Sequence, residues 1–405
     1  MSRGLGDVYK RQIEIYDGVD GLTVADFEAD GVRYGLGDIG PAISAQDIRS
    51  FFFTNRDSLD LDDEDTLVES TAGDYSMDED VLAAYLMSTC ERGGLHIVYG
   101  VRYEDTDFTA DGQRIVVNDI TGSGDPEVQP VTFSQDYDHV LPSVNVRYMT
   151  GDFVIRAAAT QTIARPNFSE LSPGGEINFE IDDNENILEA EIGNPNLQPV
   201  EATNLDLGVE WYPGGASLIS AGLFYKDLDN FVVIADVGDS IDLTPLVGNV
   251  PIDDPEVIMP VNGDSAELFG IELAIVQQFD SGFFFSANGT FVDSEATYPD
   301  RDGKTQLPRT PDTVLNGAIG WENEIFSLRL AATYRDQALQ GFEELDDPAF
   351  DVYQDTHTQL DLSAKWNITD KLQLSMAAVN ITDEPYYAYF GNSQYNAQYE
   401  EYGRT

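Results

Sequence analysis

The chain has 405 residues, of which 74 are acidic and 21 are Lys or Arg, and its net charge of −53 argues against nucleic acid as a partner because phosphate would be repelled. No stretch approaches the roughly 20 continuous apolar residues of a membrane-spanning helix, which excludes helical spans. Membrane-spanning β-strands are not excluded, because their alternating pattern gives a weak hydropathy signal. The only cysteine, Cys90, excludes a disulfide framework and a cysteine-ligated metal site.

The start of the chain has little regular pattern. Residues 1–12, MSRGLGDVYKRQ, carry positive charge with no apolar core behind it, so they are not a signal peptide; they resemble a translated linker, and we interpret them as a non-native start. Residues 13–78 are expected to hold one or more strands and a long loop. Within them, DLDDEDTLVE (60–69) lacks the glycine that an EF-hand needs at its sixth position, which favours a solvated acidic loop over a calcium site.

From residue 80 onward the chain alternates apolar and polar or small residues with a period of two, which predicts β-strands. In the hairpin at 204–228, for example, the apolar series ends at Trp211 and a Pro-Gly-Gly turn leads into a second strand of the same period. Strands of about 11 residues suit a tilted membrane crossing. The predicted strands are 80–91, 94–106, 139–149, 152–164, 202–212, 216–228, 267–279, 282–294, 312–322, 325–337, 357–367 and 371–382.

The connections between these strands fall into two classes that alternate strictly. Short turns lie at 91–94, 149–152, 212–217, 279–282, 321–324 and 367–371. Long loops lie at about 107–138, 165–201, 229–266, 295–311, 338–356 and 383–400. Outer-membrane barrels have short periplasmic turns and long extracellular loops, whereas a soluble sandwich has no reason to place every long loop at one end. The pattern therefore predicts an all-β, antiparallel transmembrane β-barrel, present as an open partial barrel of about 12–13 strands.

The three tryptophans support a membrane location. Trp211, Trp321 and Trp366 each lie on the apolar face of a strand, shortly before a short turn. Barrels carry such aromatic girdles at the membrane interface. We therefore expect the apolar face to meet lipid, with Leu207, Leu328 and Leu362 outward and exposed. The opposite, polar face should line the lumen and includes Arg102, Arg147, Arg156, Asp206, Glu210, Arg329, Asp361 and Lys365.

Three segments resemble the C-terminal barrel of TonB-dependent outer-membrane receptors. The first, 137–174, contains Arg165-Pro166-Asn167-Phe168 (RPNF); the second, 193–232, begins Gly193-Asn194-Pro195-Asn196-Leu197 (GNPNL); the third, 372–392, contains Asn380-Ile381-Thr382-Asp383 (NITD). The stretches 78–87 and 100–106 are also similar to this family. The resemblance covers about 75–405 well and the earlier part loosely, and it implies that residues 79–405 form the C-terminal part of the barrel. We interpret RPNF and GNPNL as structural motifs that fix strand ends, because Pro restricts φ and Asn tolerates turn geometry.

The resemblance implies a twenty-two-stranded barrel filled by an N-terminal plug. It also implies import of a scarce small-molecule ligand across the outer membrane, driven by contact between the plug and the TonB–ExbB–ExbD complex. The resemblance favours a carbohydrate or another nutrient over a ferric siderophore. No plug, TonB-contacting box or final aromatic-ended strand is visible, so we expect truncation at both ends and no TonB-dependent uptake by this polypeptide alone.

No catalytic, cofactor-binding or metal site is predicted, and the ligand-binding residues stay unknown. His96, His139 and His357 are far apart in sequence without metal-ligand spacing, and no G-x-S-x-G elbow lies near a plausible triad. Two alternatives to a receptor stay open. A passive porin would share the barrel but lack the family motifs, and a secreted acidic adhesin would lack the tryptophan placement and the alternating loop lengths.

The long loop at 229–266 is acidic and contains neither Lys nor Arg. We expect its field to repel anionic ferric siderophores and to tolerate neutral sugars or cationic complexes. Its carboxylates include Asp236, Asp239, Asp242, Asp253, Asp254, Glu256 and Asp264.

Overall fold

The structure is a computed structural model. It describes residues 16–17, 27–29, 33–34, 37–38, 42–58, 60–61, 63–118, 120, 125–182, 185–238, 241–244, 251–299, 301–343 and 347–404. Residues 1–12, interpreted above as a non-native start, lie outside these ranges. Within the described residues, no helix has the length and apolar character needed to cross a membrane.

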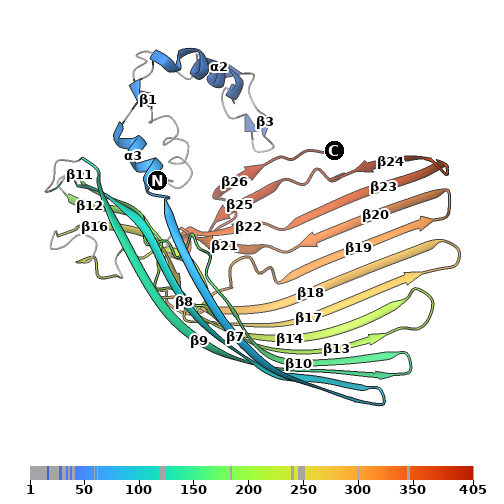
Figure 1. The fold of residues 1–405 in the computed structure, drawn as a ribbon. Coiled ribbons are helices and arrows are strands. Elements are labelled where there is room, and N and C mark those ends of the chain that lie inside the picture. The colour runs from blue at the N-terminus through green and yellow to red at the C-terminus, as the bar shows by residue number, and fades with distance from the viewer. Residues whose placement is uncertain are drawn as a thin grey trace.

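One antiparallel sheet of twelve long strands, which we call the wall, dominates the molecule (Figure 1). Its strands are β7 (Tyr75–Arg92), β8 (Leu95–Asn118), β9 (Glu127–Thr150), β10 (Phe153–Ala164), β13 (Val200–Trp211), β14 (Leu218–Asp229), β17 (Ser265–Gln278), β18 (Phe283–Thr297), β19 (Thr313–Glu322), β20 (Phe326–Arg335), β23 (His357–Thr369) and β24 (Leu372–Ala378). Each pairs with the next in this order, and the edge strands β7 and β24 do not pair with each other. The prediction of an open partial barrel of about 12–13 strands is confirmed.

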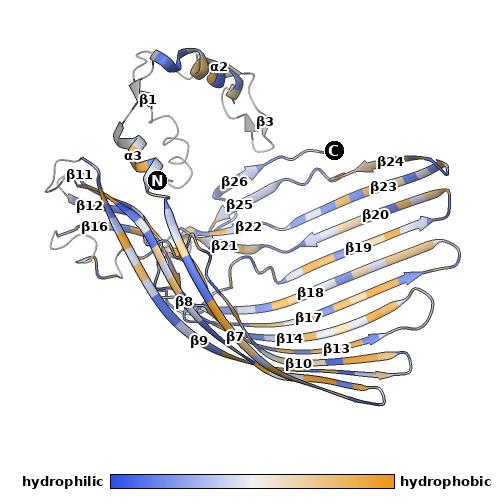
Figure 2. Cartoon of the chain, in the orientation of Figure 1, coloured by the Kyte–Doolittle hydropathy of each residue, from blue (hydrophilic) through white to orange (hydrophobic). Residues whose placement is uncertain are grey.

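The wall has one apolar face and one polar face, and Figure 2 shows hydrophobic and hydrophilic residues alternating along its strands. Leu207, Leu328 and Leu362 are 49%, 49% and 37% exposed, as expected for side chains that meet lipid. Near the short turns, Trp211 stacks on Phe153 with ring centroids 6.0 Å apart. A stack of the same kind joins Trp366 and Phe326 at 5.7 Å. These stacked pairs extend the predicted girdle across neighbouring strands.

The short turns lie together at one end of the wall, and the long connections lie at the other (Figure 1). The prediction that the long connections are loops is wrong for most of them. β8 and β9 continue pairing as far as Val116 and Glu127. Two hairpins extend the same sheet in the order β15-β16-β12-β11-β8, with β11 parallel to β8 and β12 parallel to β16. They are formed by β11 (Gly175–Asp182), β12 (Glu185–Ile192), β15 (Val232–Asp236) and β16 (Asp254–Asn262).

The last two long connections form a separate four-stranded antiparallel sheet. Its strands are β21 (Ala338–Phe342), β22 (Asp351–Gln354), β25 (Tyr386–Phe390) and β26 (Asn396–Glu400), and η3 (Pro348–Phe350) precedes β22. We call this sheet and the β11–β12 and β15–β16 hairpins, with the segments that join them, the extracellular assembly. Each of these strands pairs within its own connection, and β11, β12, β16, β22 and β25 also pair with a strand from another part of the chain.

The hydrophobic core lies where the extracellular assembly packs against the ends of wall strands β8, β17 and β18, because along the rest of the wall the apolar face points outward. The larger cluster of buried side chains contains Ile177, Phe179, Leu188, Ala190, Ile192, Phe231, Val233, Ala235, Val237, Val257, Ala266, Ala296 and Tyr298. A smaller one contains Phe108, Ala110, Leu171 and Leu197. The assembly is thus a packed body rather than a set of independent loops.

The described residues before β7 form two helices and several two-residue strands: β1 (Tyr16–Asp17), β2 (Glu28–Ala29), β3 (Arg33–Tyr34), β4 (Gly37–Asp38), β5 (Ala42–Ile43), α2 (Ala45–Asn55), η2 (Arg56–Ser58), β6 (Asp60–Leu61) and α3 (Asp63–Thr71). The acidic stretch 60–69, expected to be a loop, therefore lies largely in α3. Wall strand β7 begins at Tyr75, inside the range 13–78. Because part of this range lies outside the described residues, the expectation of further barrel strands there stays a prediction.

Candidate functional site

The RPNF motif ties the segment after β10 to the wall. Arg165 donates through Nη2 to Glu104 Oε2 at 2.8 Å and to Thr106 Oγ1 at 3.0 Å. Its Nε lies 3.5 Å from Glu79 Oε1 on β7. Arg102 donates to the other oxygen of Glu104 at 2.5 Å. The Glu104 side chain is only 11% exposed, and its carboxylate accepts hydrogen bonds from both arginines. This contact holds the start of the extracellular assembly over the lumen face.

RPNF and GNPNL meet in one hydrogen-bonded junction. The Asn167 backbone N–H donates to Glu170 Oε2 at 2.7 Å, which closes a turn after the proline. The Glu170 carbonyl accepts the N–H of Asn194 at 2.7 Å. A Cβ on Gly193 would lie 2.3 Å from the Ser172 carbonyl oxygen, so only glycine fits there. The sequence located both motifs but gave no sign that they contact each other.

NITD ends the wall. The N–H of Asn380 donates to Asp361 Oδ1 at 2.9 Å. Asn380 has φ of 54°, and its side chain accepts the N–H of Glu384 at 2.9 Å. This left-handed backbone ends β24 at Ala378, earlier than the predicted end at 382.

The lumen face near the short turns carries a row of basic side chains. His96, Arg147 and Arg156 line a cavity of about 360 Å³ together with Asp206. Arg156 forms an ion pair with Glu210 at 2.6 Å, and His96 lies 3.2 Å from Glu91 Oε1. Basic and acidic side chains thus lie side by side on the lumen face at this end of the wall.

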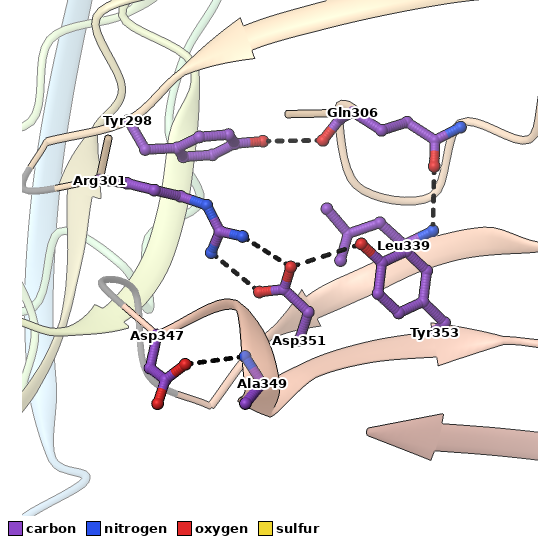
Figure 3. A network of polar contacts seen from close by, with 8 residues as sticks. All are labelled: Tyr298, Arg301, Gln306, Leu339, Asp347, Ala349, Asp351 and Tyr353. Atoms are coloured by element: carbon purple, nitrogen blue, oxygen red, sulfur yellow. Dashed lines mark hydrogen bonds and ion pairs between the residues drawn. The ribbon is translucent and has the colours of Figure 1, made fainter. Parts of the chain in front are cut away.

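The extracellular assembly contains a buried ion pair, shown in Figure 3. Arg301, in the connection after β18, donates to both oxygens of Asp351 on β22 at 2.8 and 2.6 Å. The two side chains are 6% and 2% exposed. The guanidinium also lies 4.8 Å from the ring centroid of Phe342, and the Tyr353 hydroxyl donates to Asp351 at 3.4 Å. This bidentate pair joins the β18–β19 connection to the β20–β23 connection.

Tyr298 packs beside this pair. Its ring meets Phe231 and Phe342 edge to face, with centroids 5.2 and 4.7 Å away, and its hydroxyl donates to the Gln306 carbonyl at 3.4 Å. Burial raises the pKa of the Tyr298 hydroxyl. Burial and the Asp351 carboxylate likewise raise the pKa of Tyr353. Both phenols therefore stay neutral and act as hydrogen-bond donors at physiological pH.

Several carboxylates of the acidic loop are used inside the fold. Asp236 accepts the N–H groups of Gly238 and Val257 at 2.9 and 2.8 Å. Asp253 accepts the N–H of Asn186 in the neighbouring hairpin at 2.9 Å. Hydrogen bonds from Thr244 lower the pKa of Asp242. Asp239 lies outside the described residues. Asp236 and Asp253 therefore accept hydrogen bonds from backbone N–H groups of the fold, which gives these carboxylates a structural role.

The three histidines lie on different strands and are not brought together. His139 lies 3.4 Å from Glu201 and meets the Tyr137 ring edge to face, and His357 lies 3.5 Å from the Gln359 side chain. Among the described residues, no group of three or more His, Cys, Asp or Glu side chains has an arrangement that could hold a metal ion.

The chain belongs to the family described as TonB dependent receptor-like, beta-barrel, whose model matches residues 3–381. Among curated proteins, it is 25% identical over 216 residues to the vitamin B12 transporter BtuB of Photobacterium profundum. That match covers 53% of this chain and 31% of the transporter, so the chain spans about a third of the length of this relative.

Solved structures share the fold. The ferric-catecholate import receptor Fiu from E. coli K12 matches with a TM-score of 0.57 and 16% identity, over 82% of this chain and 44% of that chain. The siderophore receptor PiuA from Acinetobacter baumannii matches with a TM-score of 0.54 and 17% identity, over 82% and 42%. The chain is thus an outer-membrane protein of a transport-receptor family and not an enzyme.

Proposed function

We propose that these residues form the greater part of the barrel wall of a receptor that imports a metal chelate, with energy supplied through TonB. The match of the family over residues 3–381 is the observation that carries this proposal. The twelve-stranded wall with its polar inner face and packed extracellular assembly supports it, because a ligand must first be held outside the membrane and then pass along a polar lumen.

The names of similar proteins favour a metal chelate over the carbohydrate that the resemblance first suggested. One is a vitamin B12 transporter, another is a ferric-catecholate import receptor and a third is a siderophore receptor. The charge of −53 restricts the choice further. An acidic surface concentrates cations and repels anions, so a neutral or cationic chelate fits this chain better than a trianionic ferric catecholate.

The partners follow from the same proposal. A plug domain inside the lumen would contact the TonB–ExbB–ExbD complex, and the apolar face of the wall would contact outer-membrane lipid. Both agree with the division of the wall into a polar and an apolar face.

The test is uptake in a strain that lacks its own receptors, expressing the longest reading frame that carries these residues. Three labelled probes are compared: cobalamin, a neutral ferric hydroxamate and an anionic ferric catecholate. We expect uptake of a neutral probe that stops when tonB is deleted and changes little with salt. Uptake that persists without TonB would indicate a porin, and uptake of the catecholate alone would contradict the proposed charge preference.

A further inference from the structure

Strand β9 has a long free edge beyond the point where β10 leaves it. β9 pairs with β8 from Glu127 to Tyr148, but with β10 only from Ser143 to Thr150. Among the residues that the structure describes, none pairs as a strand or forms a backbone hydrogen bond with the other side of 127–142. The backbone N–H and C=O groups on that side are therefore open to a partner.

Two features limit the usable part of this edge to residues 131–138. Pro130 has no N–H to donate, so it ends the edge on one side. At the other end, the side chain of His139 contacts β13, with 3.4 Å between its Nε2 and Glu201 Oε1. The segment between these points exceeds the usual strand length of about 5–6 residues, so it is long enough to pair with an additional strand.

Strand β9 is held in place from two directions along this segment. Towards β8, Thr132 Oγ1 donates to Asp111 Oδ1 at 2.5 Å, and the hydroxyls of Ser134 and Thr109 lie 3.2 Å apart. On the opposite face, Phe133 packs against the smaller cluster of buried side chains. The edge is therefore formed before any partner arrives, which lowers the entropy lost when a strand binds.

The exposed face beside the edge is acidic. Asp136 is the Cα partner of Asp107, and Asp138 is the Cα partner of Asp105. Like charges directly opposite each other destabilise a sheet. None of these four carboxylates forms an ion pair or a side-chain hydrogen bond with any residue that the structure describes. A strand with basic side chains on this face would lie directly beside Asp136 and Asp138 and would reduce the repulsion.

We propose that residues 131–138 are a docking edge for an extended segment of another polypeptide, which joins the sheet as a strand on the extracellular side. The free backbone groups supply the pairing, and the carboxylates select the charge of the partner. The partner has lysine or arginine at alternate positions, on the face of Asp136 and Asp138, with uncharged residues between them. The docking edge goes beyond the proposed import function, since it concerns a protein partner.

A second copy of this chain fits the docking edge poorly. Pairing between two such edges would bring Asp136 and Asp138 of both copies onto one short stretch of sheet. The net charge of −53 repels another copy in addition. The carboxylates thus protect the edge against self-association, as charged residues do on exposed strands, and leave it open to a basic segment.

The test uses the whole chain in micelles of an uncharged detergent, which do not themselves attract a basic peptide. The probe is a fluorescently labelled peptide of about eight residues, alternating lysine and valine, within the usual range of strand lengths. Binding is followed by fluorescence anisotropy, and amide exchange in 131–138 by mass spectrometry. One control peptide has glutamate in place of lysine. Another keeps the lysine and valine side chains but is methylated on every backbone nitrogen, so it cannot donate backbone hydrogen bonds.

Two double variants separate this edge from acidity in general. Asp136→Asn with Asp138→Asn is the test variant, and Asp227→Asn with Glu267→Gln is the matched control. Asp227 and Glu267 are also directly opposed Cα partners, but their strands β14 and β17 are paired on both sides. The control therefore removes the same number of opposed carboxylates from a place without a free edge.

We expect the lysine peptide to bind and to slow amide exchange in 131–138. Its affinity should fall about five- to tenfold in the test variant and stay unchanged in the control variant, and neither control peptide should bind. Absence of binding, binding without protection of 131–138, equal binding of the methylated peptide, or equal losses in the two variants would overturn the proposal. Protection of 131–138 that rises with protein concentration in the absence of peptide would also overturn it, because the occupant would then be a second copy.

Discussion

Asp351 is the buried charge on which two extracellular connections depend. Its replacement by Asn removes the carboxylate that accepts both hydrogen bonds of the buried Arg301 guanidinium, which is 6% exposed. Removing one partner of a buried pair costs about 3–5 kcal/mol. We therefore expect Asp351→Asn to lower the free energy of local opening of β21 and β22 by about that amount, measured by native-state hydrogen exchange.

The matched control is an exposed pair in the same connection. Lys304 and Glu295 lie 2.8 Å apart with both side chains 55% exposed. Since exposed pairs contribute about 0–1 kcal/mol, Glu295→Gln should leave the exchange of β21 and β22 nearly unchanged. Equal effects of the two substitutions would show that Arg301 and Asp351 do not hold the connections together.

Tyr298 makes the extracellular assembly sensitive to alkaline pH. Its pKa is raised above the ordinary value of 10.0 because it is buried, so the unfolded state loses this proton first. The stabilisation is complete below pH 10 and declines as pH rises toward the folded-state pKa. We expect the opening free energy to fall as the pH rises above about 10, and to fall less in Tyr298→Phe. An identical pH profile in both proteins would count against the burial of this hydroxyl.

Among the elements, the wall strands were predictable and the extracellular strands were not. Period-two alternation and short turns located all twelve wall strands, because each has one face in lipid and one in the lumen. In β8 beyond Glu104, by contrast, Phe108 and Ala110 are buried by Leu171 and Leu197 from another connection. The sequence pattern within one strand cannot predict a packing partner that comes from a distant connection.

The parallel pairing of β11 with β8 depends on close backbone approach. A Cβ on Gly174 would lie 2.6 Å from the Gln113 carbonyl oxygen. We expect Gly174→Ala to push β11 from β8 and to speed amide exchange in 175–182, as measured by mass spectrometry. Gly341→Ala in β21 is the control, because nothing lies within 4 Å of its Cβ position. Unchanged protection of β11 in Gly174→Ala would contradict the observed pairing.

In the whole molecule, two environments stabilise two parts. The extracellular assembly buries a core that it shares with the ends of β8, β17 and β18, while the wall leaves apolar side chains such as Leu86 and Met376, 76% and 67% exposed, on its outer face. Exposure of this apolar surface to water would be unfavourable, whereas in a bilayer the same surface contacts the lipid chains. The fold is therefore that of a membrane wall carrying an extracellular body, and the lumen face is the only polar path along it.

A nitroxide scan along β23 in lipid bilayers tests most directly whether the wall has one lipid-facing and one lumen-facing side. Cys90→Ser first removes the only native cysteine. Single cysteines at successive positions 359–366 are labelled, and collision rates with oxygen and with a water-soluble nickel chelate are compared. We expect oxygen maxima at Leu360, Leu362, Ala364 and Trp366, and nickel maxima at Gln359, Asp361, Ser363 and Lys365. Nickel access at every position, or oxygen maxima on the charged residues, would contradict a membrane wall with a polar lumen.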